Sequence, residues 1–380
     1  MMPRKKVIML CTHHLDSPFK VGSHYFREYF ISQNYDVLYL SAPITPFHIL
    51  KLKESDVRER IRKCFKSTQS SNDGELIPAS LLAPDSNYFL NSNFVIKNWH
   101  YFSSDILKKI KRQNFLNPEL LYIDNIFYSF LLAKLSPEKT IFRVMDKHIA
   151  FPGWGKNIFN LAQNITEKSD LVVYSAKNLL SYVDELGASK SKYIPNGLDL
   201  KLYERILPAP SLYQELSGPI AVYVGSLDKW FNYEWVLSAA KKLPKVSFVI
   251  IGPSEFNGIK FKEQKNIYYL GAIKNKQVVP FLQWADVGLI PFNTNEFEDL
   301  IKTINPIKLY EYEAAGLPVI SSKWESSELH NSKATLVENY VEFERALTLI
   351  SKSKKEKSLD IKNYDWSNIL KLNLQPFLDD

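Results

Sequence analysis

The sequence is poor in cysteine and has no long apolar run. Among its 380 residues the only cysteines are Cys11 and Cys64, which excludes a disulfide framework or a metal site built from cysteines and favours a reducing cytoplasm. The apolar stretch after Lys6 ends at Leu10, so it is too short for a signal peptide and predicts a buried first strand. No apolar run approaches the ~18 residues that span a bilayer.

Several short motifs are also missing. The sequence contains no G-x-G-x-x-G, G-x-x-x-x-G-K-[ST], G-x-S-x-G or H-E-x-x-H. It also lacks D-x-D, the acidic pair that often holds a divalent ion on a nucleotide-sugar diphosphate. We therefore expect no metal and no cofactor. Helix N-termini and basic side chains would have to neutralise a bound diphosphate.

What is present indicates an ordinary folded protein with a basic first half. Hydrophobic residues make up 45% of the sequence and charged residues 23%, which is typical of globular proteins. A chain of 380 residues is longer than a domain with a single hydrophobic core usually is, so we expect two domains. The net charge of +7 lies entirely in residues 1–200, while residues 201–380 are neutral overall. This imbalance indicates an anionic partner for the first half: a membrane surface, a phosphorylated acceptor or nucleic acid.

The first half alternates short strands with helices, which predicts a mostly parallel sheet covered on both faces. Strands are expected at 7–10, 35–39, 120–123, 140–144, 171–174 and 192–194, with a helix at 22–32. Residues 67–93 are rich in Ser, Asn and Asp and predict an excursion over the surface. Residues 51–66 have apolar positions at near-helical spacing among basic ones, which fits either a helix packed on the sheet or one resting on anionic lipid.

A second series begins near residue 219. Strands are expected at 219–225, 246–251, 267–270, 287–290 and 318–321, and helices at 233–242, 277–284 and 307–315. The segment between the two series contains residues that interrupt helices and strands: Pro208, Pro210 and Gly218. We therefore expect two doubly wound domains, 1–205 and 206–360, and a C-terminal helix at 361–380.

One segment of the second half carries a specific chemical signal. Pro306 opens a helix whose N-terminus can bind an anion, and Lys308 lies in its first turn. A cation is disfavoured there by the helix dipole, so Lys308 makes better sense facing a ligand phosphate. Glu311 follows one turn later on the same face and could accept hydrogen bonds from ribose hydroxyls, although a plain surface Lys–Glu pair fits equally well.

Four motifs together give a resemblance. They are IPNGLD at 194–199, YVGSLDKWFNYE at 223–234, IIGP at 250–253 and PIKLYEYEAAGLPVIS at 306–321. In this order and spacing they resemble GT-B glycosyltransferases of bacterial cell-surface polysaccharide synthesis, the teichuronic-acid-type transferases and, more distantly, xanthan glucuronosyltransferase. The resemblance is strong over 190–322 and implies two Rossmann-like domains facing a central cleft, with the C-terminal helix crossing back to the first domain.

The resemblance implies a donor site in the second domain. Lys308 would meet the diphosphate and Glu311 the ribose, while Gly225 and Ser226 would line the phosphate loop. The implied donor-binding residues are Gly225, Ser226, Asp228, Ile273, Phe292, Asn305, Lys308 and Glu311. Many retaining members have a second Glu eight positions before the ribose-binding one. Here that position is Thr303, which leaves an inverting mechanism open.

An inverting transfer needs a general base for the acceptor hydroxyl. Asp146, just after the strand at 140–144, is our choice of base, and His148 is the second choice. Alternatively, Asp146 caps the following helix and pairs with a neighbouring cation. For acceptor contact we select Gly22, His24 and Asp124, which follow the first and third expected strands, although a lone histidine at a helix start is more often structural.

These inferences add up to one functional hypothesis. The chain is expected to move a hexose or uronic acid from a nucleotide sugar, UDP-linked by resemblance, to a saccharide or lipid-linked saccharide in capsule or exopolysaccharide synthesis. It would be cytoplasmic and peripheral on the inner face of the membrane, in contact with anionic lipid and not with nucleic acid. The alternatives are a GT-B nucleotide-sugar epimerase and a non-catalytic nucleic-acid- or lipid-binding protein.

Overall fold

The computed structural model divides the chain into two compact units. Unit 1 comprises Met1–Ser175 and Leu179–Ile194, and unit 2 comprises Ala176–Asn178 and Pro195–Asp380. The division therefore falls at Ile194, ahead of the boundary we expect at 205. The structure describes residues 4–17, 20–52, 55–65, 74–83, 92–102, 105–150, 156–254, 258–330, 332–349 and 361–380.

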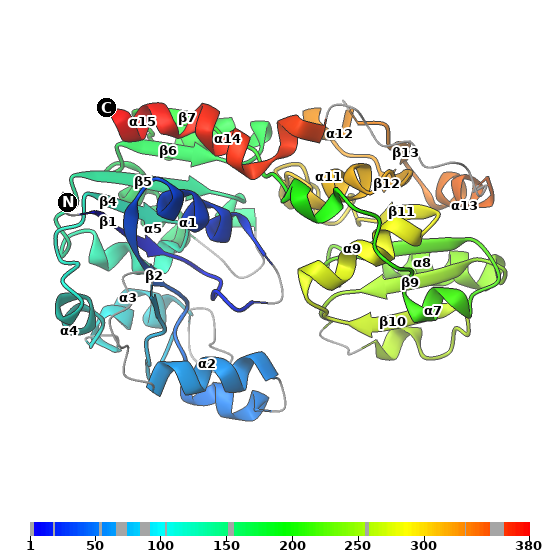
Figure 1. Cartoon of the computed structure of the whole chain (residues 1–380), viewed down its shortest axis with the longest axis horizontal. Coiled ribbons are helices and arrows are strands. Elements are labelled where there is room, and N and C mark those ends of the chain that lie inside the picture. The colour runs from blue at the N-terminus through cyan, green and yellow to red at the C-terminus, as the bar shows by residue number, and fades with distance from the viewer. Residues whose placement is uncertain are drawn as a thin grey trace. The chain divides into compact units, whose positions relative to one another are not determined.

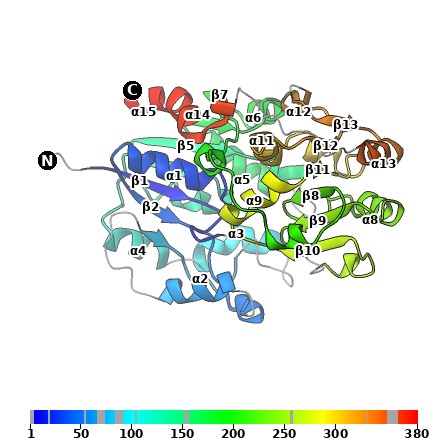
Figure 2. The same ribbon diagram turned by 45° about the vertical axis from the view of Figure 1, so that its right-hand side comes forward.

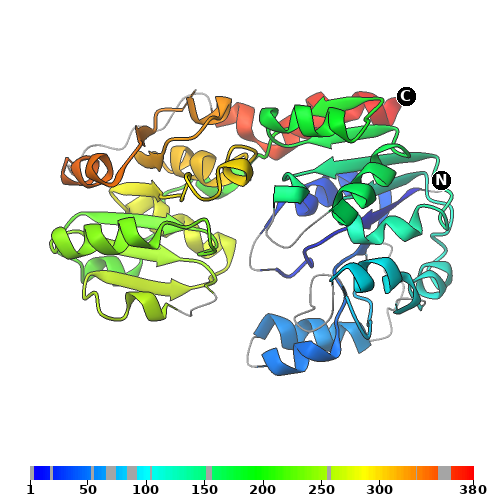
Figure 3. The same ribbon diagram turned by 180° about the vertical axis from the view of Figure 1, so that it is seen from behind.

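Unit 1 is built on a seven-stranded, wholly parallel sheet in the order β3-β2-β1-β4-β5-β6-β7 (Figure 1). Its strands are β1 (Lys5–Leu10), β2 (Tyr35–Leu40), β3 (Glu75–Leu76), β4 (Leu120–Ile123), β5 (Lys139–Val144), β6 (Leu171–Tyr174) and β7 (Ser191–Tyr193). Its α-helices are α1 (Gly22–Ser32), α2 (Ser55–Phe65), α3 (Ser92–Phe102), α4 (Asp105–Arg112), α5 (Lys156–Thr166) and α6 (Leu180–Glu185). Figures 1 and 3, seen from opposite sides, show helices on both faces of the sheet.

Unit 2 repeats the plan with six parallel strands in the order β10-β9-β8-β11-β12-β13 (Figure 2). They are β8 (Ile220–Val224), β9 (Ser247–Ile251), β10 (Ile267–Gly271), β11 (Val287–Ile290), β12 (Val319–Ser322) and β13 (Thr335–Val337). The α-helices are α7 (Ser211–Gln214), α8 (Tyr233–Lys242), α9 (Asn275–Trp284), α10 (Glu298–Ile301), α11 (Ile307–Ala314), α12 (Ser327–His330), α13 (Tyr340–Thr348), α14 (Trp366–Asn373) and α15 (Gln375–Asp379).

The order of the strands indicates at which edge of each sheet a ligand is expected to bind. In unit 1 the order reverses between β1 and β4, and in unit 2 between β8 and β11. Parallel strands buried on both faces are nearly all apolar, as β4 and β11 are, so polar groups collect in the loops that follow them. Ligands of such sheets bind at the carboxyl ends beside the reversal. The loops after β1, β4, β5 and β8 are therefore the places to examine.

The predicted fold class is confirmed, since both units are parallel α/β sheets. One expectation is wrong over its described part. Residues 74–83 do not run over the surface, because β3 pairs with β2 and Leu76 and Ile77 are buried. A two-residue strand is too short to show a period in the sequence. The basic segment does form a helix, α2, and Val57 on it is buried. Among the described helices none is long and apolar enough to cross a membrane.

Candidate functional site

Two glycines join the carboxyl ends of the first three strands in unit 2. The Gly225 N–H donates to Ile251 O at 2.9 Å, and the Gly252 N–H donates to Gly271 O at 2.8 Å. Gly225 and Gly252 have φ of +147° and +149°, which side chains disfavour. A Cβ on Gly252 would lie 1.9 Å from Gly225 O. Glycine at these positions therefore permits the backbones after β8 and β9 to touch.

Lys308 lies directly against this glycine turn. A Cβ on Gly225 would be 2.2 Å from its Cε, so the lysine stem fills the space that a side chain would occupy. Its ammonium lies 5.5 Å from the ring centroid of Tyr223 and 5.3 Å from that of Phe292. Burial lowers the pKa of Lys308 to about 8, and the Glu311 carboxylate opposes only part of that shift. A cation placed this way in the first turn of α11 is set up to receive an anion.

Two further polar groups lie on the same segment. Burial raises the pKa of Glu311 to about 7, against the opposing effect of Lys308, and its Oε1 accepts from Asn275 Nδ2 at 3.4 Å. Asn305 is 3% exposed, and within the described part of the chain neither atom of its side-chain amide has a hydrogen-bond partner. An unsatisfied buried amide costs free energy, which a ligand hydroxyl or phosphate oxygen would recover.

The other side chains that we predicted to bind the donor differ in how exposed they are. Ser226, Asp228 and Ile273 are half-buried in the loops after β8 and β10, where a ligand can reach them. Phe292 is only 2% exposed and packs on Trp324 with ring centroids 5.5 Å apart. Its ring therefore lies beside the Lys308 ammonium, 5.3 Å away, and its direct contact with the donor stays a prediction. The burial arises from packing that its position after β11 does not reveal.

Thr303 does not supply the carboxylate of the retaining pattern. Its side chain is 2% exposed, and its hydroxyl donates to Leu300 O at 2.8 Å. The residue thus closes the turn after α10, and no acidic group stands in its place.

Comparison with known proteins finds a family model that matches the part of the chain holding this site. Residues 218–352 match the family model described as glycosyl transferases group 1. The match lies within unit 2 and covers less than half of the chain. The matched region holds Gly225, Gly252, Asn305, Lys308 and Glu311, so it includes the glycine turn and the lysine described above.

Individual proteins are also similar to this chain, at low identity. The Bacillus subtilis (strain 168) protein named as a teichuronic acid biosynthesis glycosyltransferase, TuaH, is 25% identical over 200 residues, 50% of this chain and 49% of TuaH. The chain thus aligns with about half of that relative's length. Sucrose-phosphate synthase from Thermosynechococcus elongatus is 13% identical with a TM-score of 0.71, covering 99% of both chains. Anabaena HepE, solved with UDP and glucose, is 13% identical with a TM-score of 0.65, again covering 99% of both. The fold is GT-B.

In unit 1 the sequence-predicted base lies near a buried arginine. Asp146 follows β5 and is half-buried, and burial raises the pKa of its carboxyl to about 6 although Arg143 acts in the opposite direction. Arg143 is fully buried, with its guanidinium carbon 4.8 Å from the ring centroid of Phe26. A half-exposed carboxyl with a pKa of about 6 is mostly ionised at neutral pH and still basic enough to accept a proton.

The two other candidates near this strand end are more deeply enclosed. Asp124 is 5% exposed, accepts from Thr12 N at 3.0 Å, and has a pKa that burial raises to about 6, with the Thr12 N–H and Arg143 opposing. His148 is 9% exposed and places Nδ1 3.3 Å from Tyr182 Oη, and burial lowers its pKa to about 4. Asp146 therefore remains the candidate best placed to meet a hydroxyl.

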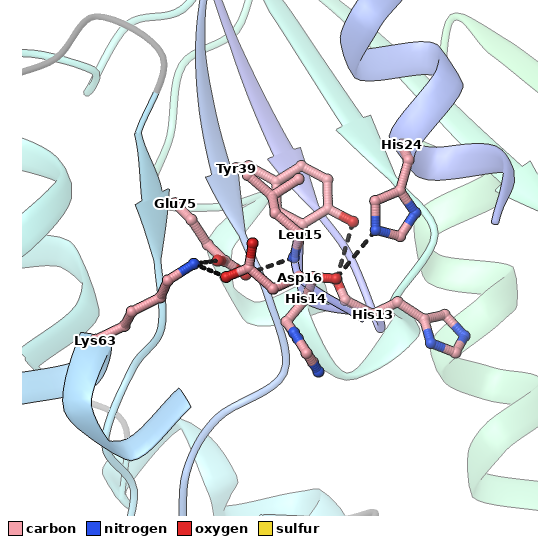
Figure 4. Close-up of polar contacts among 8 residues, drawn as sticks. All are labelled: His13, His14, Leu15, Asp16, His24, Tyr39, Lys63 and Glu75. Carbon is pink, nitrogen blue, oxygen red and sulfur yellow. Dashed lines mark hydrogen bonds and ion pairs between the residues drawn. The ribbon is translucent and has the colours of Figure 1, made fainter. Parts of the chain in front are cut away.

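Gly22 and His24 both have structural roles within unit 1, and their contact with an acceptor stays a prediction. A Cβ on Gly22 would lie 1.7 Å from Arg143 Nη1, so the glycine leaves room for the guanidinium. His24 is 6% exposed; its Nδ1 accepts from Val21 N at 3.1 Å and its Nε2 lies 3.0 Å from His14 O. Both ring nitrogens are engaged by backbone, and the ring ties the start of α1 to the loop after β1 (Figure 4).

The loop after β1 is also held from the opposite side, a feature that sequence reasoning missed. Tyr39 Oη donates to His13 O at 2.9 Å, and Leu15 N donates to Glu75 Oε1 at 2.9 Å. Lys63 of α2 pairs with Asp16 and lies 3.6 Å from Glu75 Oε2 (Figure 4). Lys63 and Asp16 are 47 residues apart in the sequence, and no feature of the sequence around either residue predicts that they pair. Among the described residues no three His, Cys, Asp or Glu side chains are grouped to hold a metal ion.

Replacing Lys63 by Met is expected to lower the stability of the chain. The Glu75 side chain is 6% exposed, so removing the ammonium leaves a buried carboxylate with the Leu15 N–H but without its nearby cation, at a cost of about 1–3 kcal/mol. Asp16→Asn is the matched control. Its side chain is 46% exposed, so that variant should change stability by less than about 1 kcal/mol. Urea unfolding midpoints measure both, and an equal loss in the two variants would contradict the role given to Glu75.

Proposed function

We propose that the chain transfers a hexose or uronic acid from a UDP-linked sugar to a hydroxyl of a saccharide or lipid-linked saccharide in capsule or exopolysaccharide synthesis. The observation that carries the proposal is the half-buried Lys308 side chain, packed against Gly225 in the region that matches the group 1 family model, with its pKa lowered to about 8. The name of TuaH and the UDP and glucose bound by HepE support the substrate class.

The donor roles follow from the geometry. The Lys308 ammonium and the N-terminus of α11 neutralise the diphosphate, while the Glu311 carboxylate accepts from the ribose hydroxyls. The unsatisfied Asn305 amide hydrogen-bonds a phosphate or sugar oxygen. Gly225 and Ser226 let the backbone approach the phosphates, and Ile273 contacts the base. Because the sequence has no D-x-D, we propose that this neutralisation needs no metal ion.

The proposed reaction is an inverting displacement. Asp146 accepts the proton of the acceptor hydroxyl, whose oxygen forms a bond to the anomeric carbon of the donor sugar. The bond between that carbon and the phosphate oxygen breaks, and the nucleoside diphosphate leaves with its charge held by Lys308. The pKa of Asp146, about 6, suits a base working near neutral pH.

We place the enzyme in the cytoplasm, on the inner face of the membrane, where a lipid-linked acceptor would be available. The seven excess positive charges of residues 1–200 support contact with an anionic surface. The names of the relatives and structural neighbours, synthases and transferases, do not favour an epimerase or a non-catalytic binding protein.

A panel of nucleotide sugars tests the proposal. A cognate donor stabilises the native state by mass action, about 2.7 kcal/mol at a concentration of one hundred times Kd, so one UDP-sugar should raise Tm clearly above UDP-free controls. With a crude lipid acceptor that donor should yield a glycosylated product and UDP. Failure of every nucleotide sugar to shift Tm would overturn the assignment, and conversion of the donor into an isomer without acceptor would establish an epimerase instead.

A further inference from the structure

Unit 1 presents a cluster of exposed apolar side chains at one place. Ile49, Leu50 and Leu52 are 61%, 83% and 41% exposed. In the described part of the chain no other stretch of four positions exposes more than one large hydrophobic side chain. Single exposed apolar residues are normal on a protein surface, whereas a contiguous set indicates a contact surface.

The cluster is carried by a defined short helix and not by a loose loop. Ile49 and Leu50 belong to the 3₁₀ helix η1 (Pro46–Lys51), and Leu52 caps it by donating from its N–H to Ile49 O at 3.3 Å. At the other end the Thr45 N–H donates to His48 Nδ1 at 3.1 Å, and Thr45 is buried. The apolar tip is thus ordered before it meets a partner, which reduces the entropy lost on docking.

Basic side chains lie directly beside the apolar tip. Arg58 of α2 donates from Nη1 to Leu52 O at 3.1 Å, which puts its guanidinium against the cluster. Arg62 lies one helical turn further on the same face, and both arginines are exposed. Residues 46–65 contain six Lys and Arg against three Asp and Glu. In Figures 1, 2 and 3 α2 lies at one end of unit 1, on the side of β2.

We propose that η1 and α2 form a membrane-docking face, in which Ile49, Leu50 and Leu52 enter the lipid headgroup region and Arg58 and Arg62 contact anionic headgroups. An apolar tip flanked by arginines matches the interface of an anionic bilayer, with its negative surface above a hydrocarbon layer. A nucleic acid would use the charges and leave the apolar tip without a partner. The inference rests on the proposed function only in that a lipid-linked acceptor gives the docking its purpose.

The docking face is also joined to the loop after β1. Arg60 Nη2 donates to Ala42 O at 3.1 Å, and Lys63 pairs with Asp16 and Glu75, so α2 is fastened to the body of unit 1 on the side away from Arg58 and Arg62. These two cations face the body of unit 1 and are half-buried, whereas Arg58 and Arg62 are exposed, so Arg60 and Lys63 are left out of the lipid-binding set. Docking through η1 and α2 consequently leaves the loop after β1 intact.

Vesicle co-sedimentation tests the apolar part with neither donor nor acceptor present. The full chain should bind phosphatidylglycerol vesicles at low salt and bind phosphatidylcholine vesicles far more weakly. Leu50→Glu removes an inserting side chain and adds a repelled charge, so it should lower partitioning by about tenfold or more. Leu372→Glu is the matched control, because Leu372 on α14 is 74% exposed and lies outside the docking face, and it should bind as the unmodified chain does.

Charge variants on one helix test the electrostatic part. Arg58→Gln and Arg62→Gln should each weaken binding to phosphatidylglycerol vesicles by about fivefold, since each cation near an anionic surface contributes about that factor. Glu59→Gln, an exposed acidic position next to Arg58, should strengthen binding slightly. All of these side chains are exposed, so circular dichroism should show folded variants.

The outcomes separate this inference from the proposed function. Equal vesicle binding by Leu50→Glu and the unmodified chain, or weaker binding by Glu59→Gln, would overturn the docking face even if sugar transfer is found. Binding to a short DNA duplex in preference to vesicles would overturn it in favour of a nucleic-acid surface. If the docking variants lose vesicle binding while no nucleotide sugar is turned over, the docking face stands and the transferase proposal fails.

Discussion

Lys308→Met is expected to reduce kcat/KM for sugar transfer by about 10²- to 10³-fold, the usual loss when one charge-stabilising group is removed. Methionine keeps the apolar stem that packs against Gly225 and removes only the ammonium. The negative charge that develops on the departing diphosphate would then lack its main side-chain counterion. Initial rates with a saturating acceptor and varied donor measure the change.

The same variant should be at least as stable as the unmodified chain when no donor is present. The pKa of Lys308 is lowered to about 8 by burial, which means that folding disfavours its charged form. That penalty applies at pH 7 and is relieved only as the pH rises above 8, so removing the charge should raise Tm at neutral pH. Loss of activity with a gain in stability distinguishes a ligand-facing cation from a structural one.

Lys302→Ala is the control for a lysine of the same region. Its ammonium pairs with Asp299, and its side chain is 33% exposed, so activity should stay within about twofold, as expected for a surface ion pair. Activity retained by Lys308→Met, or lost equally in the two variants, would contradict the assignment of Lys308 to the diphosphate.

The sequence predicted most elements because their apolar patterns are local. The strands Leu120–Ile123 and Val287–Ile290 and the helices Gly22–Ser32 and Tyr233–Lys242 lie where the patterns place them. By contrast, β3 (Glu75–Leu76) is too short to show a period, and its pairing with β2 depends on tertiary packing.

The candidate site was predictable in position and only partly in role. The strand rhythm places Gly225, Lys308 and Glu311 at the carboxyl ends of one sheet, and the structure brings them together. Whether a side chain faces a ligand or the interior depends on neighbours far along the chain. His24 is turned inward by the carbonyl of His14, and Phe292 is covered by Trp324. Neither contact could be inferred from spacing.

Asp146→Asn is expected to lower kcat by about 10²- to 10⁴-fold, because the amide cannot accept the proton of the attacking hydroxyl. The fold should be retained, since Asp146 is half-buried and asparagine is nearly isosteric. Equal Tm values for the two proteins would show that the loss lies in the chemistry.

The pH dependence identifies the base more sharply than the rate alone. Asp146 and Glu311 both work as carboxylates, so kcat/KM of the unmodified chain should begin to fall near pH 7, where Glu311 gains a proton. It should fall more steeply below about pH 6, where Asp146 does. On the alkaline side it should fall above about pH 8, where Lys308 loses its proton in the free enzyme. The residual activity of Asp146→Asn should keep the alkaline limb and the shallow fall near pH 7, and it should lose the acid limb near pH 6.

Two other carboxyls titrate in the same range and serve as matched controls. Burial raises the pKa of Asp124 to about 6 and that of Glu311 to about 7. Glu311 is assigned to hydrogen bonds with the ribose, so Glu311→Gln should raise KM for the donor and keep the acid limb. Asp124→Asn should also keep that limb, because Asp124 is buried and accepts from the Thr12 N–H. If the limb disappears in Asp124→Asn and persists in Asp146→Asn, the base is Asp124, and the acceptor hydroxyl must reach deeper into unit 1 than the exposure of Asp146 implies.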